Sequence, residues 1–335
     1  MINFIDECKN TILETQKLLK QNKEWGIRYF KYAEEINANL ETIIKHKKRF
    51  NEWSPLYLYM NVTEAKGSMK FSLRYLGQDV AKLKVDTDKI TISTKGFDKN
   101  NERDFGCDVQ LKKGKDGNVE WKSADASNFR SYFSTHPKRT NSSRKKNEEH
   151  RIESLLLTEF SKRSSKNKKL CNTQPVKLAN IARFQMPTPL SESKKIKYSV
   201  QRGGGIDIIS RIGTGRSTKL CIMEVKDENV SKEPPSKAIQ QCLAYATFIR
   251  ELLGSNSGKK WWKIFGFNGD CPDKPGIYVA CVMPSKTNND TSFAGDIIEN
   301  DQGSFHLHYI YFEEDDNKIV NIETSLGNCS TKNHI

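Results

Sequence analysis

Three charged residues lie on two consecutive predicted strands, where they could act together. Asp207 follows three glycines near the start of one apolar run, and Glu224 and Lys226 lie two residues apart in the next. Because side chains alternate along a strand, Glu224 and Lys226 share one face. The glycine-containing segment 213–217 predicts a hairpin that holds the two runs side by side. Two carboxylates and an ammonium at one sheet edge suit a divalent cation beside a phosphate.

Two predicted helices flank these strands and supply further candidates. The helix before them carries Glu149 and Glu153 inside its apolar arc, where a carboxylate is costly unless it is paired or binds metal. The pattern leaves open which of the two faces the site. The helix after them carries Gln241 and Tyr245 one turn apart at the rim of its apolar stripe, within reach of the same sheet edge.

The charge balance favours a polyanionic partner. The 335 residues include 55 Lys and Arg against 41 Asp and Glu, a formal net charge of +14. Nucleic acid is the first choice, and contacts to backbone phosphates would give affinity without sequence specificity. The candidate phosphate-binding residues share two basic clusters: Lys138, Arg139, Arg144, Lys145, Lys146, Lys168 and Lys169. Trp261 and Trp262 are candidates for stacking on exposed bases, with at least one of them expected in the core.

Cysteine spacing and hydropathy exclude several classes of protein. The eight cysteines include no CxxC pair, so neither a zinc ribbon nor a four-cysteine iron–sulfur cluster is expected. A reduced, cytoplasmic setting is the simpler expectation. The N-terminus lacks the pattern of a signal peptide, and no apolar run approaches the roughly 18 residues that span a bilayer. We therefore expect no membrane partner.

The pattern along the chain predicts an α/β protein in two parts. We expect an N-terminal helix and β-meander domain at 1–133, a basic linker at 134–147, a second domain at 148–325 and a tail at 326–335. The first part should hold a helix at 4–46 that is broken at Gly26. Four antiparallel strands are expected at 56–60, 69–75, 80–85 and 89–93, followed by a loop at 97–118. The second should hold a mixed sheet with helices packed on it, with elements expected at 147–163, 176–186, 206–212, 219–226, 236–253, 277–283, 305–312 and 318–323.

The ordered set of motifs resembles the PD-(D/E)XK nuclease superfamily. A glutamate-bearing helix is followed by Asp207, by Glu224-Val225-Lys226 and by a Gln-x-x-x-Tyr element similar to that of the RecB-type branch, over about residues 147–285. Ile206 stands where the name-giving proline would be, and the iron–sulfur cysteine cluster of some RecB-type members is missing. The resemblance implies a restriction-endonuclease-like fold.

The same resemblance implies a metal-dependent nuclease that hydrolyses phosphodiester bonds in DNA. Asp207, Glu224 and the Val225 carbonyl would bind Mg²⁺ or Mn²⁺, helped by Glu149 or Glu153. The metal would neutralise the phosphate and activate a water. Lys226 would stabilise the transition state, while Gln241 and Tyr245 would position the nucleophile or an adjacent phosphate.

Two other functions remain as alternatives. The substrate of the same fold could be RNA, or the protein could be a non-catalytic nucleic-acid-binding module on a decayed nuclease fold. The retention of two acids beside a lysine argues against decay, because adjacent buried carboxylates are costly. Exonuclease or endonuclease action, specificity, the role of 1–133 and the formation of a homodimer stay open.

Overall fold

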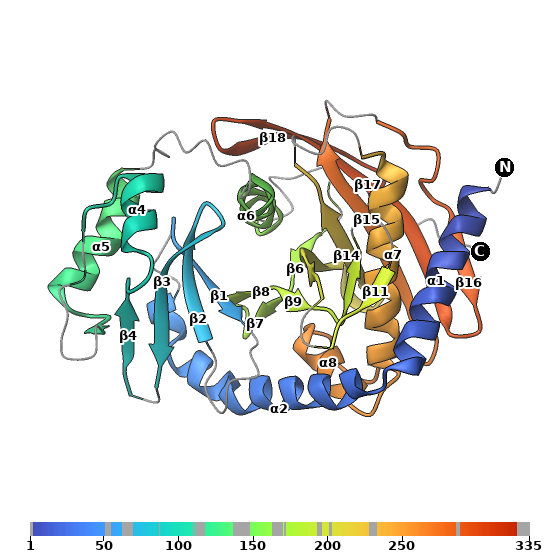
Figure 1. Cartoon of the computed structure of the whole chain (residues 1–335), viewed down its shortest axis with the longest axis horizontal. Coiled ribbons are helices and arrows are strands. Elements are labelled where there is room, and N and C mark those ends of the chain that lie inside the picture. The colour runs from blue at the N-terminus through green and yellow to red at the C-terminus, as the bar shows by residue number, and fades with distance from the viewer. Residues whose placement is uncertain are drawn as a thin grey trace. The chain divides into compact units, whose positions relative to one another are not determined.

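The computed structural model of this chain shows a mixed α/β protein (Figure 1). It describes residues 3–50, 55–61, 70–86, 88–109, 111, 118–136, 148–162, 170, 172–192, 196–200, 203–227, 233–285 and 289–326. The chain forms two compact units. Unit 1 comprises Met1–Lys31, Ile152–Val176 and Met186–Ile335, and unit 2 comprises Tyr32–Arg151 and Lys177–Gln185. The expected α/β class is therefore confirmed.

A seven-stranded mixed sheet forms the centre of unit 1. Its strands run in the order β16-β17-β15-β14-β13-β6, and β18 pairs with β17. β13 is antiparallel to both β6 and β14, whereas β14, β15 and β17 are mutually parallel. The strands are β6 (Gln174–Pro175), β13 (Ile208–Ile212), β14 (Lys219–Val225), β15 (Gly276–Pro284), β16 (Ile297–Asn300), β17 (Gly303–Asp315) and β18 (Lys318–Thr324).

The crossover helix α7 (Pro235–Leu253) joins β14 to β15 and packs on both. Such a crossover makes parallel neighbours possible, and strands covered in this way need nearly continuous apolar sequence. The run Leu220–Val225 meets that need, since every residue of it is buried. Helix α1 (Phe4–Gln21) lies beside α7 in Figure 1 and contacts it along its length.

The long N-terminal helix expected at 4–46 is two helices, and the break is not at Gly26. Helix α1 ends at Gln21, where the Asn22 side chain donates to the Leu18 carbonyl at 2.8 Å. Helix α2 (Glu24–Lys45) then contains Gly26 in its first turn. A glycine inside a helix costs only about 1 kcal/mol, so Gly26 alone does not end α2.

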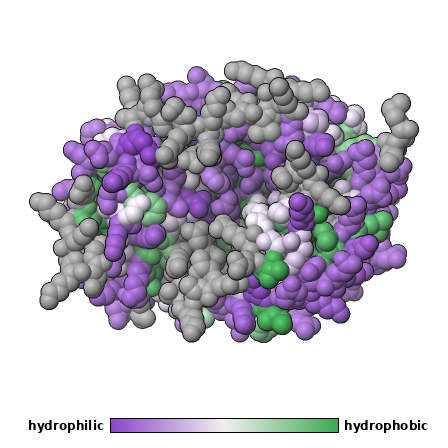
Figure 2. All heavy atoms as spheres, viewed as in Figure 1, coloured by the Kyte–Doolittle hydropathy of each residue, from purple (hydrophilic) through white to green (hydrophobic). Residues whose placement is uncertain are grey.

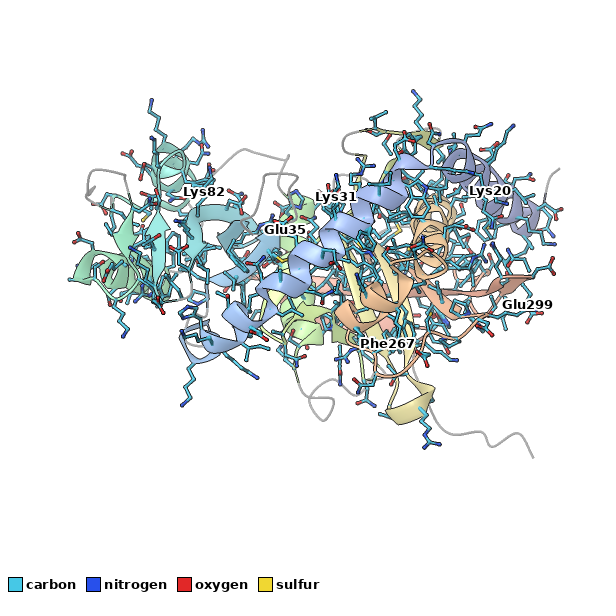
Figure 3. All side chains as sticks on the ribbon, turned by 90° about the horizontal axis from the view of Figure 1, so that it is seen from below. Lys20, Lys31, Glu35, Lys82, Phe267 and Glu299 are labelled. Carbon is cyan, nitrogen blue, oxygen red and sulfur yellow. The ribbon has the colours of Figure 1, made fainter. Side chains whose placement is uncertain are left out.

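Aromatic packing explains why the first residues belong to unit 1 rather than to the predicted domain 1–133. Trp25 and Tyr29 of α2 both make edge contacts with Phe248 of α7, at ring distances of 5.7 and 4.8 Å. Trp261 in helix α8 (Gly258–Ile264) donates from Nε1 to the Tyr29 carbonyl at 3.1 Å. Unit 2 begins one turn later, at Tyr32. Figure 3 labels Lys31 and Glu35 on either side of this boundary.

Both tryptophans of α8 lie in the core. Trp261 has none of its surface exposed, and Trp262 is 7% exposed. Neither therefore forms the open stacking platform for bases that the sequence suggested, because the apolar face of this short helix is turned inward.

Unit 2 is built on a second seven-stranded sheet, in the order β5-β4-β3-β2-β1-β8-β7. The four strands expected in the N-terminal part match β1 to β4 and pair antiparallel. β8 adds to β1 in parallel, so the segment 177–185 completes a sheet that begins some 120 residues earlier in the chain. The strands are β1 (Tyr57–Asn61), β2 (Lys70–Tyr75), β3 (Gln78–Val85), β4 (Ile90–Ser93), β5 (Val119–Glu120), β7 (Lys177–Leu178) and β8 (Ala182–Phe184).

Three further helices correspond only in part to expectation. Helix α4 (Asp98–Phe105) lies within the stretch 97–118 that the sequence predicted as a loop. Although its sequence is polar, α4 has a short buried face made by Asn101, Asp104 and Phe105. Gly106 ends the helix in a left-handed conformation. Helix α5 (Ala124–Thr135) was not expected, and helix α6 (Glu148–Phe160) matches the helix predicted at 147–163.

No helix in the described part of the chain is long and apolar enough to cross a membrane. On the face of the protein that Figure 2 shows, the coloured residues are mostly hydrophilic, and the apolar ones form small patches.

A half-buried histidine in β17 is expected to make the stability of unit 1 depend on pH. His308 lies with its ring 4.8 Å from that of Tyr278 and its Nδ1 3.1 Å from Ser325 Oγ. Burial, assisted by the charge of His306, lowers the pKa of His308 from 6.5 to about 4. Between these two values the unfolded chain binds more protons than the folded one, so stability is complete above pH 6.5 and falls as the pH decreases towards 4.

We expect H308Q to lose less stability than the wild type over that pH range. The difference in the free energy of unfolding should reach roughly 2 kcal/mol at pH 4, measured by urea denaturation at a series of pH values. H136Q, at an exposed histidine, serves as the control and should follow the wild type. Parallel pH curves for H308Q and the wild type would contradict the assignment.

Candidate active site

The β13–β14 hairpin brings the two predicted carboxylates together. Its register pairs Ile208 with Met223, and one step further along the same register places Asp207 opposite Glu224. Asp207 lies at a bend between β12 (Gly205–Ile206) and β13, and its Oδ2 accepts from the Val225 N–H at 2.8 Å. Asp207 is 7% and Glu224 2% exposed, so both carboxylates are buried at the carboxyl end of β14.

Lys226 holds the centre of the cluster. Its Nζ donates to Glu224 Oε1 at 2.9 Å and to Gln241 Oε1 at 2.9 Å. Its backbone N–H donates to the Val282 carbonyl at 2.9 Å, which extends the parallel ladder one residue past β14. The side chain is 9% exposed, so the ammonium depends on these partners rather than on water.

Helix α7 contributes Gln241 and Tyr245 to the cluster. Gln241 and Tyr245 lie one turn apart, and Gln241 Nε2 donates to Tyr245 Oη at 3.3 Å. Burial raises the pKa of Tyr245 well above its ordinary value, and the Glu224 carboxylate raises it further. The phenol therefore stays protonated at neutral pH and keeps a hydrogen to donate.

The glycine run before Asp207 allows the backbone to pass close to this cluster. A Cβ on Gly204 would lie 2.5 Å from Tyr245 Oη, and one on Gly203 would lie 2.2 Å from the Leu190 carbonyl oxygen. The Gly204 N–H donates to the same Leu190 carbonyl at 2.6 Å, which fixes the run against β10 (Leu190–Glu192). Only residues without a side chain fit at these two positions.

The charges of the cluster suit a bound cation. Glu224 and Glu233 both lie within reach of the Lys226 ammonium, at 2.9 and 3.9 Å, and Asp207 lies opposite Glu224. A buried carboxylate is costly unless it is paired or binds metal, and a divalent ion would offset that cost. Within the described ranges no group of three or more His, Cys, Asp or Glu side chains lies close enough to hold a metal by itself. Mg²⁺ needs only one or two carboxylates, with waters and phosphate oxygens for the rest, so Asp207 and Glu224 fit it.

The two candidate glutamates of α6 differ in burial and belong to different units. Glu153 is 2% exposed and belongs to unit 1, as do Asp207 and Glu224. Glu149 is half-buried and belongs to unit 2. The Val225 N–H donates to Asp207 Oδ2, and the role of the Val225 carbonyl as a metal ligand stays a prediction.

The predicted phosphate-binding residues lie outside the described residues. Lys138, Arg139, Arg144, Lys145 and Lys146 fall within 137–147, and Lys168 and Lys169 fall within 163–169. Their role therefore stays a prediction, as does that of the tail from residue 327 onward.

Glu233 is a member of the cluster that the sequence did not point to. It comes before Pro234-Pro235, at the start of α7, and its side chain is 28% exposed. Acidic residues are common at helix starts, so the sequence gives Glu233 no special role. Only the fold shows that Glu233 approaches Lys226.

Comparison with protein-family models, with curated proteins and with solved structures gave no significant match to this chain.

Proposed function

We propose that the protein is a metal-dependent nuclease that hydrolyses phosphodiester bonds in DNA, with a restriction-endonuclease-like fold of the PD-(D/E)XK type. The observation that carries this proposal is the line of hydrogen bonds from Glu224 through Lys226 and Gln241 to Tyr245, with Asp207 held beside it by the Val225 N–H. The mixed sheet of unit 1, with α7 crossing between β14 and β15, supports the fold assignment.

Asp207 and Glu224 would hold the metal, and Glu153, a buried carboxylate of α6 in unit 1, is a further candidate ligand. A bound Mg²⁺ or Mn²⁺ supplies Lewis-acid stabilisation of the phosphate and lowers the pKa of water at the site. The Val225 N–H holds Asp207 Oδ2 in place, so this carboxylate is oriented before any metal arrives.

The other side chains would act on the phosphate and the nucleophile. Glu224 and Gln241 fix the Lys226 ammonium at a buried position, where its charge stabilises a developing negative charge far more than it would in water. The Tyr245 hydroxyl keeps its proton and can donate it to a phosphate oxygen. The hydrogen bond from Gln241 Nε2 orients this hydroxyl.

The net charge of +14 supports a nucleic acid as the partner, with DNA first and RNA as the alternative substrate. Single-stranded DNA, double-stranded DNA and RNA of matched sequence should be incubated with the protein, with Mg²⁺ and with a chelator. We expect Mg²⁺-dependent cleavage of DNA. Preferential cleavage of RNA would select the alternative substrate.

A non-catalytic nucleic-acid-binding protein remains the second function, favoured by the same net charge. The double variant D207A/E224A separates it from the nuclease. Loss of cleavage with retained DNA binding would support the nuclease, whereas unchanged behaviour in every assay would identify the protein as a binding module.

We expect G204A to slow cleavage about tenfold, because the new methyl group would displace the Tyr245 hydroxyl from Gln241. Single-turnover rates measure this effect. G254A is the matched control, since a Cβ there would meet nothing nearer than 3.7 Å and should leave the rate unchanged.

The effect of G204A should be smaller in a Y245F background, where the clashing hydroxyl is absent. Additive effects of the two substitutions would show that Gly204 acts through something other than Tyr245.

A further inference from the structure

A cavity of unit 1 opens at the turn end of the β13–β14 hairpin. It has a volume of about 550 Å³ and lies at the turn after β13, whereas Asp207 and Glu224 lie at the hairpin's other end. Its size falls in the usual range for pockets that bind small molecules. The lining side chains that carry charge or aromatic rings are Arg211, Arg216, Lys219, Trp262, Phe267 and Asp270.

Positive charge dominates the wall of this cavity. Arg211, Arg216 and Lys219 supply three cations, and Asp270 is the one carboxylate among the described lining residues. Asp270 is already paired with Lys259, which lies outside the lining, at 2.8 Å. The cavity therefore has an excess of positive charge that attracts an anion.

Arg211 is the cation that the fold holds most firmly. Its Nη1 donates to the Gly266 carbonyl and its Nη2 to Gln174 Oε1, at 2.5 and 3.0 Å. Among the described residues, its buried Nε has no hydrogen-bond partner and no carboxylate oxygen lies within 4.0 Å of the guanidinium. A half-buried guanidinium without a counter-ion is costly, and a bound anion would offset that cost.

The lining also includes an aromatic pair with one buried donor. Trp262 stacks on Phe267 with ring centroids 3.9 Å apart, and Figure 3 labels Phe267 just after α8. Trp262 is 7% exposed, and its buried Nε1 has no hydrogen-bond partner among the described residues. Buried indole N–H groups normally have an acceptor, which a ligand that reaches this one would supply.

We propose that this cavity binds a nucleoside 5′-phosphate. The phosphate lies against Arg211, Arg216 and Lys219, and an acceptor atom on the edge of the base receives the Trp262 N–H. Arginine pairs well with phosphate, and the apolar wall covers the base. The ligand is either a free nucleotide or the 5′-phosphorylated end of a nucleic-acid strand. The proposal is independent of the nuclease activity, because none of these residues belongs to the candidate active site.

Isothermal titration of the full-length protein with adenosine 5′-monophosphate tests the proposal. We expect binding with a Kd below about 1 mM, which competing inorganic phosphate and added salt both weaken. Adenosine, which lacks the phosphate, should bind at least about tenfold more weakly. Equal binding of adenosine and the monophosphate would overturn the proposal.

Two variants locate the binding. R211Q and R216Q should each weaken binding of the monophosphate about tenfold. R216Q matters most if R211Q fails to fold, because Arg216 is an exposed residue of the turn. K318Q removes an exposed lysine of β18 that does not line the cavity, and it should bind as the wild type does. Unchanged affinity in R216Q would overturn the proposal.

A 5′-phosphorylated oligonucleotide distinguishes the two sources of the ligand. Binding of this strand but not of the free nucleotide, weakened by R216Q, would assign the cavity to a strand end; no binding of either would overturn the proposal. E224Q separates the cavity from the candidate active site. It should leave binding of the monophosphate unchanged, and a loss in E224Q alone would place the ligand at the active site instead. Absence of cleavage by the wild type would contradict the nuclease and leave these results intact.

Discussion

K226A should reduce the rate of DNA cleavage by about 1,000-fold, while the affinity for DNA changes by less than about threefold. The reason for the loss is that the Lys226 ammonium is buried and fixed by Glu224 and Gln241, so no water or other cation of the described cluster replaces its charge in the transition state. We expect the affinity to survive because binding to DNA would be spread over many phosphate contacts. Single-turnover kinetics and filter binding measure the two quantities separately.

K237A is the matched control for this substitution. Lys237 is an exposed lysine of the same helix that carries Gln241, and its removal should leave both quantities unchanged. Because removing one partner of a buried ion pair destabilises a protein, the thermal unfolding of K226A has to be compared with that of the wild type. A folded K226A that loses rate and affinity equally would exclude a role for Lys226 in the chemical step.

E224Q should lower the rate of cleavage by about 100-fold or more and raise the Mg²⁺ concentration required for half the maximal rate by about tenfold. The substitution keeps the size of the side chain and removes its charge. The Glu224 side chain is 3% exposed, lies opposite Asp207 in the hairpin and accepts a hydrogen bond from Lys226 Nζ at 2.9 Å. Loss of its charge should therefore change both the metal affinity and the position of the ammonium. A Mg²⁺ titration of the cleavage rate measures both effects.

E233Q provides a stringent comparison, since Glu233 also faces Lys226. Its carboxylate is 28% exposed and 3.9 Å from Lys226 Nζ, and a pair of this kind contributes at most about 1 kcal/mol. We expect less than about a threefold change in rate and no change in the Mg²⁺ requirement. Equal effects of E224Q and E233Q would show that the cluster acts through its total charge rather than through a metal held by Glu224.

Much of the candidate site could be predicted because its signals are local. Alternation along 219–226 placed Glu224 and Lys226 on one face, and the glycine turn at 213–217 set the hairpin register that brings Asp207 opposite Glu224. Helical spacing likewise predicted the pair formed by Gln241 and Tyr245.

The features that the sequence did not predict depend on contacts between distant segments. The close approach of Gly204 to Tyr245 joins residues on two different elements, and no local pattern contains it. The burial of Trp261 depends on its contact with Tyr29 of α2, and that of Trp262 on its stack with Phe267. Local propensity also missed α4, because its sequence is polar and only tertiary packing buries one side of it.

The order of strands in unit 2 was equally beyond reach of the sequence. Extended segments at 176–186 were expected, but nothing in them indicates that β8 pairs in parallel with β1. Strand order is set by how whole faces pack, and a single sequence shows only the period of each strand.

This strand order means that the chain is interwoven rather than divided at its linker. The backbone passes between the two units at four places, and β7 and β8 follow the segment 137–147 while the strands they join precede it. A fragment starting at residue 148 would thus carry two strands of a sheet whose other members are missing, and the complementary fragment would expose the edge of β1. A protease cut within 137–147, by contrast, leaves every one of these pairings intact, so the two pieces should stay associated and separate only under denaturing conditions.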